Sequence, residues 1–214
     1  MQTYTLTRNS LLAKVFSGLF MSLAVALVGF YAGSYVPRPL LGILSIVELV
    51  MIVGAMFIQR RRRIGLGFVL AFTFISGMTL YPVIAYYISV LGAAMVMEAV
   101  GVTAGAFLIA SILAARTSLD FSFLGGFLMV GLLSILLMGL VSLFIGFSTL
   151  MQLVYSLLGV AIFVGYILFD VNRIAHNGVS VEQVPWVVLS LYLDIINLLL
   201  FVLRLFGVLQ NSRR

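Results

Sequence analysis

Two aspartates lie in stretches of the chain that are otherwise apolar. Asp170 closes an uncharged run that begins at Phe121, and Asp194 lies eight residues into the apolar stretch that starts at Trp186. A carboxylate in hydrocarbon costs about 2.5–3.5 kcal/mol on insertion scales, so each is a functional candidate. Two carboxyls close together at low dielectric do not both ionise cheaply. We therefore expect the pair to share one proton and to titrate as a unit.

Such a pair is a two-state element that responds to pH. Protonated, Asp170 and Asp194 would bond to each other; ionised, they would repel and offer negative charge to a cation. A closed calcium cage needs about 6–8 oxygens, so only a weak, transient Ca²⁺ site at the pair is expected. Arg60, expected at the same depth, is the candidate charge partner and would favour the ionised form. The plain alternatives are an interfacial Asp170 capped by Arg173 and a structural Asp194.

Four further polar residues are candidates for lesser roles. Glu48 and Glu98 lie within apolar stretches, where they would line an ion path or be protonated packing groups. Asn197, which shares a helix face with Asp194, would orient it, bond to a neighbouring helix or line the path. His176 is expected in a loop, where a lone histidine is most often solvated.

The composition shows what surrounds these residues. Of 214 residues, 64% are hydrophobic and 8% are charged; there is no cysteine, and the net charge is +6. A soluble domain has roughly a quarter of its residues charged. This composition excludes a soluble globular enzyme, a disordered chain and a disulfide-stapled domain, and it predicts a multi-pass protein of the lipid bilayer.

The spacing of the charges predicts seven transmembrane helices in a single all-α domain, residues 1–214. A span needs about 20 apolar residues. We expect reversals at Tyr81–Pro82 and near Gly146–Thr149, because proline and glycine interrupt helices. The expected spans are residues 15–36, 40–58, 64–81, 93–114, 121–144, 151–170 and 186–206.

Arginines and lysines predict the orientation. With the N-terminus in the cytoplasm, eight of them lie inside and three outside, which favours an N-in, C-out protein. The terminal Arg213 and Arg214 argue for an alternative with six spans and a re-entrant last segment. No cleavable signal peptide is evident. The positive charge is explained by orientation, so no nucleic-acid partner is expected.

Two small-residue motifs predict close helix packing. Gly29-x-x-x-Gly33 and Gly101-x-x-x-Gly105 remove side chains from one helix face, so that a neighbouring backbone can approach.

The missing motifs argue against an enzyme. The chain contains no G-x-S-x-G, H-E-x-x-H or P-loop sequence. Zinc is not expected with one histidine and no cysteine, and no tightly bound cofactor is expected. The rival enzyme is an intramembrane aspartyl protease, which also uses two aspartates. The residues before Asp194, Leu191-Tyr192-Leu193, lack the glycine-flanked motif of that class.

Three segments resemble the transmembrane Bax inhibitor motif family, in the form of a bacterial-type member. The stretch from Leu193 to Gly207 is similar to the closing signature of that family, and Gly165–Asp170 is similar to the carboxylate-bearing helix end before it. Residues 11–32 are similar to its first span. One departure is Phe169, where members often have a tyrosine.

The resemblance implies a seven-helix fold in which the other six helices wrap a central C-terminal helix. It also implies a calcium-permeable leak channel in the cell membrane, with Asp170 and Asp194 as pH sensor and gate. Protons would be the regulator and Ca²⁺ the permeant ion. The protease-like enzyme and a non-conducting scaffold or regulator stay open as alternatives.

Overall fold

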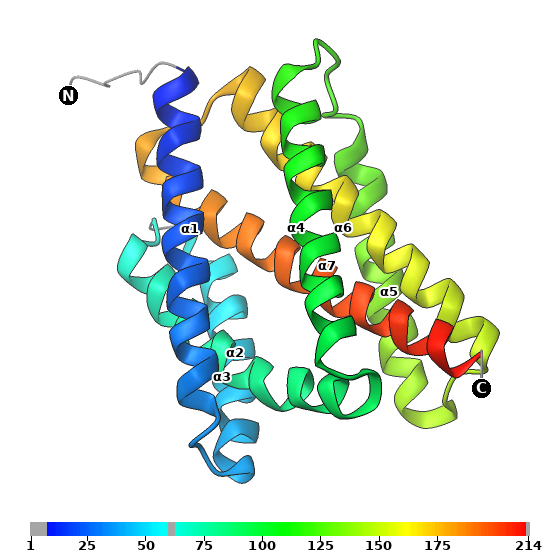
Figure 1. The fold of residues 1–214 in the computed structure, drawn as a ribbon. Coiled ribbons are helices and arrows are strands. Elements are labelled where there is room, and N and C mark those ends of the chain that lie inside the picture. Colours follow the sequence, from blue (N-terminus) through cyan, green and yellow to red (C-terminus); the bar gives the residue numbers. More distant parts are fainter. Residues whose placement is uncertain (1–7, 60–62, 213–214) are drawn as a thin grey trace. The chain divides into compact units, whose positions relative to one another are not determined.

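The structure is a computed structural model that describes residues 8–59 and 63–212. Arg60, the candidate charge partner, lies outside the described residues. Over the described part, the chain forms α-helices and one short 3₁₀ helix and contains no strand (Figure 1). The elements are α1 (Arg8–Gly33), α2 (Arg38–Gln59), α3 (Leu66–Leu91), α4 (Ala93–Arg116), α5 (Leu124–Ile145), α6 (Thr149–Asn177), η1 (Val181–Gln183) and α7 (Val184–Asn211).

In the part of the chain that the structure describes, seven helices are long and apolar enough to cross a membrane, which confirms the predicted number of spans. The last of them, α7, is a continuous helix of 28 residues. At about 1.5 Å per residue, 28 residues extend roughly 42 Å, more than the hydrocarbon core requires. The helix does not fold back along its length, as a re-entrant segment would.

The reversal expected at Tyr81–Pro82 is wrong. Helix α3 continues through Pro82 to Leu91, because one missing backbone N–H does not outweigh the continuous apolar stretch on both sides of it. The chain turns instead at Gly92, whose φ of 86° is a conformation that glycine adopts without steric cost. The second expected reversal is confirmed, since α5 ends at Ile145 and α6 begins at Thr149.

The chain divides into two compact units, and α7 contributes to both. The first consists of Met1–Tyr86 and Gly178–Tyr192, and the second of Tyr87–Asn177 and Leu193–Arg214. Of the candidate residues in the described part, Glu48 belongs to the first unit. Asp170 and Asp194 both belong to the second.

In the first unit, glycines bring the backbones of α1 and α3 together. A Cβ atom on Gly29 would overlap the carbonyl of Phe74, and one on Gly77 would overlap the carbonyl of Ala26. A Cβ on Gly33 would lie 2.7 Å from the carbonyl oxygen of Met78. The close packing expected at Gly29 and Gly33 is therefore confirmed.

In the same unit, the first part of α7 packs against α1 and α3. Val188 fills the space beside Gly18 of α1. The ring of the fully buried Tyr192 meets Phe72 of α3 edge to face, with centroids 6.3 Å apart.

In the second unit, α6 packs against α4 and α5 (Figure 1), and the second part of α7 packs against α6. The ring of Phe201 on α7 occupies the space over Gly159 and stacks on Phe163 at 5.7 Å. The packing predicted for Gly101 and Gly105 is wrong, because a Cβ at either position would meet no atom within 4 Å. Both glycines therefore face away from the helices of this unit.

Candidate functional site

Two consecutive helices carry the aspartate pair. Asp170 lies seven residues before the end of α6, and Asp194 lies ten residues after the start of α7. At about 1.5 Å per residue, these positions are roughly 10 Å and 15 Å from the connection between the helices. In that connection Gly178 adopts a φ of 67°, and Ser180 and Gln183 form a capping box on the short 3₁₀ helix. The connection between the two helices is short and includes a capping box.

Both carboxyls are buried and interact electrostatically. Asp170 is 3% exposed and Asp194 is 6% exposed, and the charge of Asp170 acts on Asp194. Within the described part of the chain, Oδ2 of Asp194 is buried without a hydrogen-bond partner. An ionised carboxylate oxygen normally accepts hydrogen bonds, and leaving it buried and unpaired is costly. A shared proton or a bound cation would relieve that cost.

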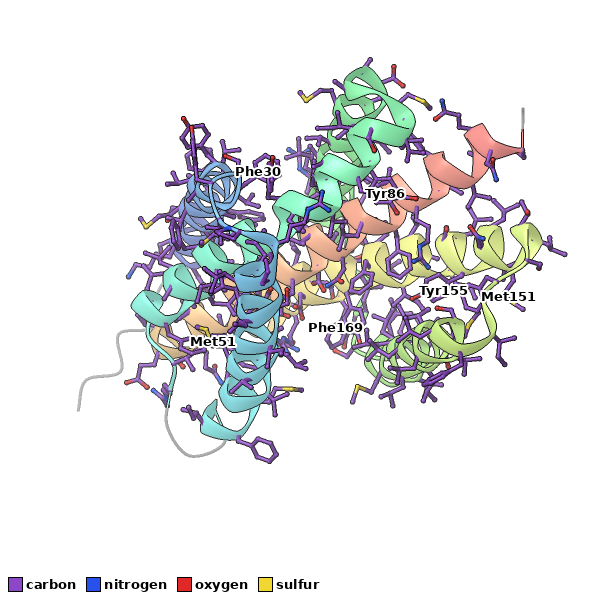
Figure 2. The ribbon with its side chains drawn as sticks, turned by 90° about the horizontal axis from the view of Figure 1, so that it is seen from below. Phe30, Met51, Tyr86, Met151, Tyr155 and Phe169 are labelled. Carbon is purple, nitrogen blue, oxygen red and sulfur yellow. The ribbon has the colours of Figure 1, made fainter. Side chains whose placement is uncertain are left out.

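Arg173 is the cation on α6 closest to the pair. Its Nη2 atom lies 3.6 Å from Oδ1 of Asp170, which is too long for a good hydrogen bond. Its guanidinium also lies 5.7 Å from the ring centroid of Phe169, a residue labelled in Figure 2. Asp170 is 3% exposed, and the nearby Arg173 guanidinium is consistent with the alternative of a carboxylate capped by Arg173.

Tyr166 is a neighbour of the pair that sequence reasoning missed. Its phenol interacts electrostatically with both Asp170 and Asp194. It lies four residues before Asp170, on the same face of α6. The sequence lacks a tyrosine at position 169, but the structure supplies a phenol one turn earlier. The i, i+4 spacing was the signal available.

Glu48 has a different environment in the first unit. Its Oε2 accepts a 2.6 Å hydrogen bond from Oγ1 of Thr79 on α3, and its side chain is half-buried. Its charge also acts on the buried Tyr192. The structure thus provides Glu48 with a hydroxyl donor.

Glu98 and Asn197, the other two candidates, have different surroundings. Glu98 lies on an exposed face of α4, about 24 Å along the helix from Ala114, the α4 residue that contacts α6 beside Asp170. Asn197 donates from Nδ2 to the backbone carbonyl of Leu193 at 2.8 Å, within its own helix.

Asn172, which the sequence reasoning did not single out, makes three hydrogen bonds to backbone groups. It is 1% exposed. Its Nδ2 donates to the carbonyls of Ala114 and Leu119, and its Oδ1 accepts from the N–H of Phe121. His176, one turn later, lies on the surface with Nδ1 3.0 Å from the Asn172 carbonyl. The only signal for Asn172 was an amide two residues after a buried carboxylate.

A second cation of this unit lies on α7. The guanidinium of Arg204 is 4.8 Å from the ring centroid of Tyr155 on α6, which Figure 2 labels. The same ring packs on Phe201 at 5.2 Å. A cation over an aromatic face is stabilised at low dielectric, so Arg204 is accommodated within an otherwise apolar helix.

The donor set of the site fits weak cation binding. Among the described residues, no three His, Cys, Asp or Glu side chains gather as a metal cluster. Two carboxylates provide fewer ligands than a closed calcium site uses. The arrangement can bind and release protons and can attract a cation, but it offers no cage.

The sequence matches a known family over almost its full length. A family model described as "Inhibitor of apoptosis-promoting Bax1" matches residues 8–212. That range includes both aspartates and all seven helices.

Three curated proteins illustrate the relationship. Bax inhibitor 1 of Schizosaccharomyces pombe is 37% identical over 145 residues, which cover 68% of this chain and 53% of the yeast protein, so the match spans about half of that relative. An uncharacterized membrane protein of Vibrio cholerae is 30% identical over 218 residues, covering 97% of this chain and 93% of the relative. A Golgi anti-apoptotic protein of Vaccinia virus (strain Lister) is 32% identical over 171 residues, covering 79% of this chain and 70% of the relative.

Proposed function

The chain belongs to the Bax inhibitor family of multi-pass membrane proteins, and on that premise we propose that it is a calcium-permeable leak channel gated by pH through Asp170 and Asp194. The observation that carries the proposal is a pair of buried, electrostatically coupled carboxyls on consecutive helices. We further propose that the protein resides in the cell membrane with its N-terminus in the cytoplasm.

The gating follows from the charge of the pair. With one proton shared, the pair has a single negative charge, and an O–H···O⁻ bond holds α6 and α7 together. Without the proton, two charges about 4 Å apart at an effective dielectric of 20 repel by about 4 kcal/mol. That energy is large enough to separate the carboxyls and to favour a calcium ion between them. We therefore expect flux to rise with pH through the range in which the pair titrates.

Neighbouring groups tune this balance. Arg173 stabilises the ionised form, and Tyr166 lies where its phenol interacts with both carboxylates. Arg60 is proposed as a further cation that favours ionisation, on the basis of its position at the end of the second span. Backbone carbonyls and water would complete the coordination of a passing calcium ion.

The test is calcium flux into liposomes reconstituted with the purified protein, measured from about pH 5 to pH 9, a range that covers the titration of buried carboxyl pairs. We expect wild-type flux to increase with pH, and Asp170→Asn and Asp194→Asn to abolish that response. Glu98→Gln is the matched control, because it removes an exposed carboxylate from the same unit. A pH response that persists in Asp194→Asn contradicts the proposal.

The same preparation distinguishes the two rival functions. A non-conducting scaffold or regulator shows no intrinsic flux at any pH. A protease of the aspartyl type cleaves a helical membrane substrate, and Asp170→Ala abolishes the cleavage.

A further inference from the structure

The connection between α4 and α5 is joined to α6 by one side chain. Asn172 uses both of its donor hydrogens and its acceptor oxygen there: Nδ2 donates to the Ala114 carbonyl at 3.1 Å and to the Leu119 carbonyl at 3.0 Å, and Oδ1 accepts from the Phe121 N–H at 3.0 Å. An asparagine amide has two donor hydrogens and one acceptor oxygen. No donor hydrogen of this amide is left for another partner.

The backbone groups that Asn172 satisfies have no helical partner. Ala114 belongs to the last turn of α4, where the final four carbonyls lack intrahelical donors. The Leu113 carbonyl accepts from the N–H of Thr117, and the Ala114 carbonyl accepts from Asn172. Leu119 and Phe121 lie in the non-helical connection before α5. Asn172 thus fixes the end of α4 and the following loop to one point on α6.

That point lies beside the aspartate pair. Asn172 follows Asp170 by two residues, or about 200° around the helix, so the two side chains leave α6 in nearly opposite directions. On the other side of Asp170 in the sequence, the ring of Phe169 lies 3.2 Å from the Cβ position of Gly125, in the first turn of α5. The turn of α6 that carries Asp170 is therefore in contact with the α4–α5 connection, through Asn172, and with α5, through Phe169.

We propose that Asn172 is a positioning residue for Asp170: it fixes the carboxyl-bearing turn of α6 to the α4–α5 connection, so that this connection moves with the aspartate pair. This inference rests on the proposed function for its effect on flux, but the physical link between loop and helix stands on the hydrogen bonds alone. A helix anchored on one side converts repulsion on its other side into a defined displacement.

Within the described residues, several titratable groups interact around this anchor. Asp170 interacts with Arg173 and Tyr166 on its own helix and with Asp194 on α7. On the connection, Asp120 accepts hydrogen bonds from Ser122 and interacts electrostatically with His176 of α6. Asn172 itself does not titrate, so it changes the response of the pair by position and not by charge.

The test uses a reporter on the loop. The chain has no cysteine, so Leu119→Cys, at a side chain that is 63% exposed, takes a single spin label. Label mobility and calcium flux are measured in the same liposomes at several pH values. In the wild-type background we expect an ordered label whose mobility changes over the pH range in which flux changes. Adding Asp194→Asn should remove that change.

Asn172→Leu keeps the size of the side chain and removes its hydrogen bonds. We expect the label to be mobile at every pH and the flux midpoint to shift by at least about half a pH unit, a threefold change in apparent proton affinity. Asn172→Gln retains the amide and should restore part of the ordering. Asn177→Ala is the matched control, because Asn177 is an exposed asparagine on the same helix. This control should change neither readout.

The outcomes separate the inference from the proposed function. If Asn172→Leu folds and leaves both label mobility and flux midpoint as in wild type, the positioning role is wrong. If Asn172→Leu does not fold, Asn172→Ala is used, which also lacks both donors; normal label mobility in Asn172→Ala is equally contradictory. If no flux occurs but Asn172→Leu releases the label, the channel proposal fails and the anchor stands. A wild-type label that does not respond to pH overturns the coupled movement.

Discussion

Glycines that approach a backbone carbonyl of a neighbouring helix are found in the first unit, and the second unit offers a comparison. In the first unit, the Cβ positions of Gly29 and Gly77 coincide with backbone carbonyls of the opposite helix. In the second unit, the Cβ positions of Gly159 and Gly165 meet the side chains of Phe201 and Leu128. Backbone contacts do not yield, whereas side chains rotate. The contacts of Gly159 and Gly165 are therefore with groups that can adjust, as is the contact of Gly18 with Val188 in the first unit.

The carboxyls that lie within the apolar helices of the two units also differ, in their hydrogen-bond partners. Glu48 of the first unit receives a hydrogen bond from Thr79. Asp170 and Asp194 of the second unit act on each other, and one oxygen of Asp194 has no hydrogen-bond partner in the described part of the chain. The neighbours of a carboxyl within a span thus decide whether it receives a hydrogen bond or lies near another negative charge. In the proposed function, the second arrangement stores the energy that a proton releases.

The largest expected effect is on the free energy of unfolding, and it tests whether a glycine beside a backbone carbonyl tolerates a methyl group less well than a glycine beside a side chain. Gly77→Ala should lower the free energy of unfolding by about 3 kcal/mol, because the α1 and α3 backbones must separate. Gly165→Ala should cost roughly 1 kcal/mol at most, because the Leu128 side chain can turn away. Thermal unfolding in detergent measures both, with the open Gly101→Ala as control. Equal losses at Gly77 and Gly165 would remove the distinction between the units.

A smaller effect tests the contrast between carboxyls. Thr79→Val keeps the shape of the side chain and removes the donor to Glu48, so we expect a loss of about 2 kcal/mol, typical of a hydrogen bond to a charged group. The pH response of flux should be unchanged in this variant, since the proposed sensor is the aspartate pair and not Glu48. A flux midpoint that moves in Thr79→Val would place Glu48 with the aspartates as a sensor.

The smallest effect concerns the loop beside the pair. Hydrogen bonds from the side chain and the backbone N–H of Ser122 lower the pKa of Asp120. Because the folded-state pKa is depressed, these bonds stabilise the fold above the unfolded-state pKa, and their contribution is lost as the pH falls through the folded value. Ser122→Ala should raise the pKa of Asp120 toward its ordinary value, as followed by NMR titration of the carboxyl carbon. Ser148→Ala, in the α5–α6 connection, is the control and should leave this pKa unaltered.

Sequence patterns predicted the helices better than the contacts between them. The number of spans and the reversal at Gly146 followed from charge spacing and glycine. The reversal at Pro82 was misplaced, since a proline within a long apolar helix costs one hydrogen bond that the surroundings compensate. The two G-x-x-x-G motifs look alike in sequence, yet only Gly29 and Gly33 face another helix. Which face is covered depends on the neighbouring helices.

Some residues of the candidate site were identified from the sequence and others were not. Asp170 and Asp194 were identified from sequence because charge is rare in an apolar stretch. Tyr166 and Asn172 were missed, because a tyrosine or an asparagine in a helix has no distinctive pattern until its partners are known. The partners of Asn172 are backbone groups more than 50 residues away in the chain.

The sequence by itself determined that this protein is a seven-helix membrane protein with two exceptional aspartates, because the free energy of placing residues in hydrocarbon depends on composition and length. Only the tertiary structure decided which carboxyls interact electrostatically, which glycines permit close contact and which groups bond to the turn of α6 that follows Asp170. Those outcomes depend on distances between groups remote in the chain, where electrostatic and hydrogen-bond energies change within a few ångströms.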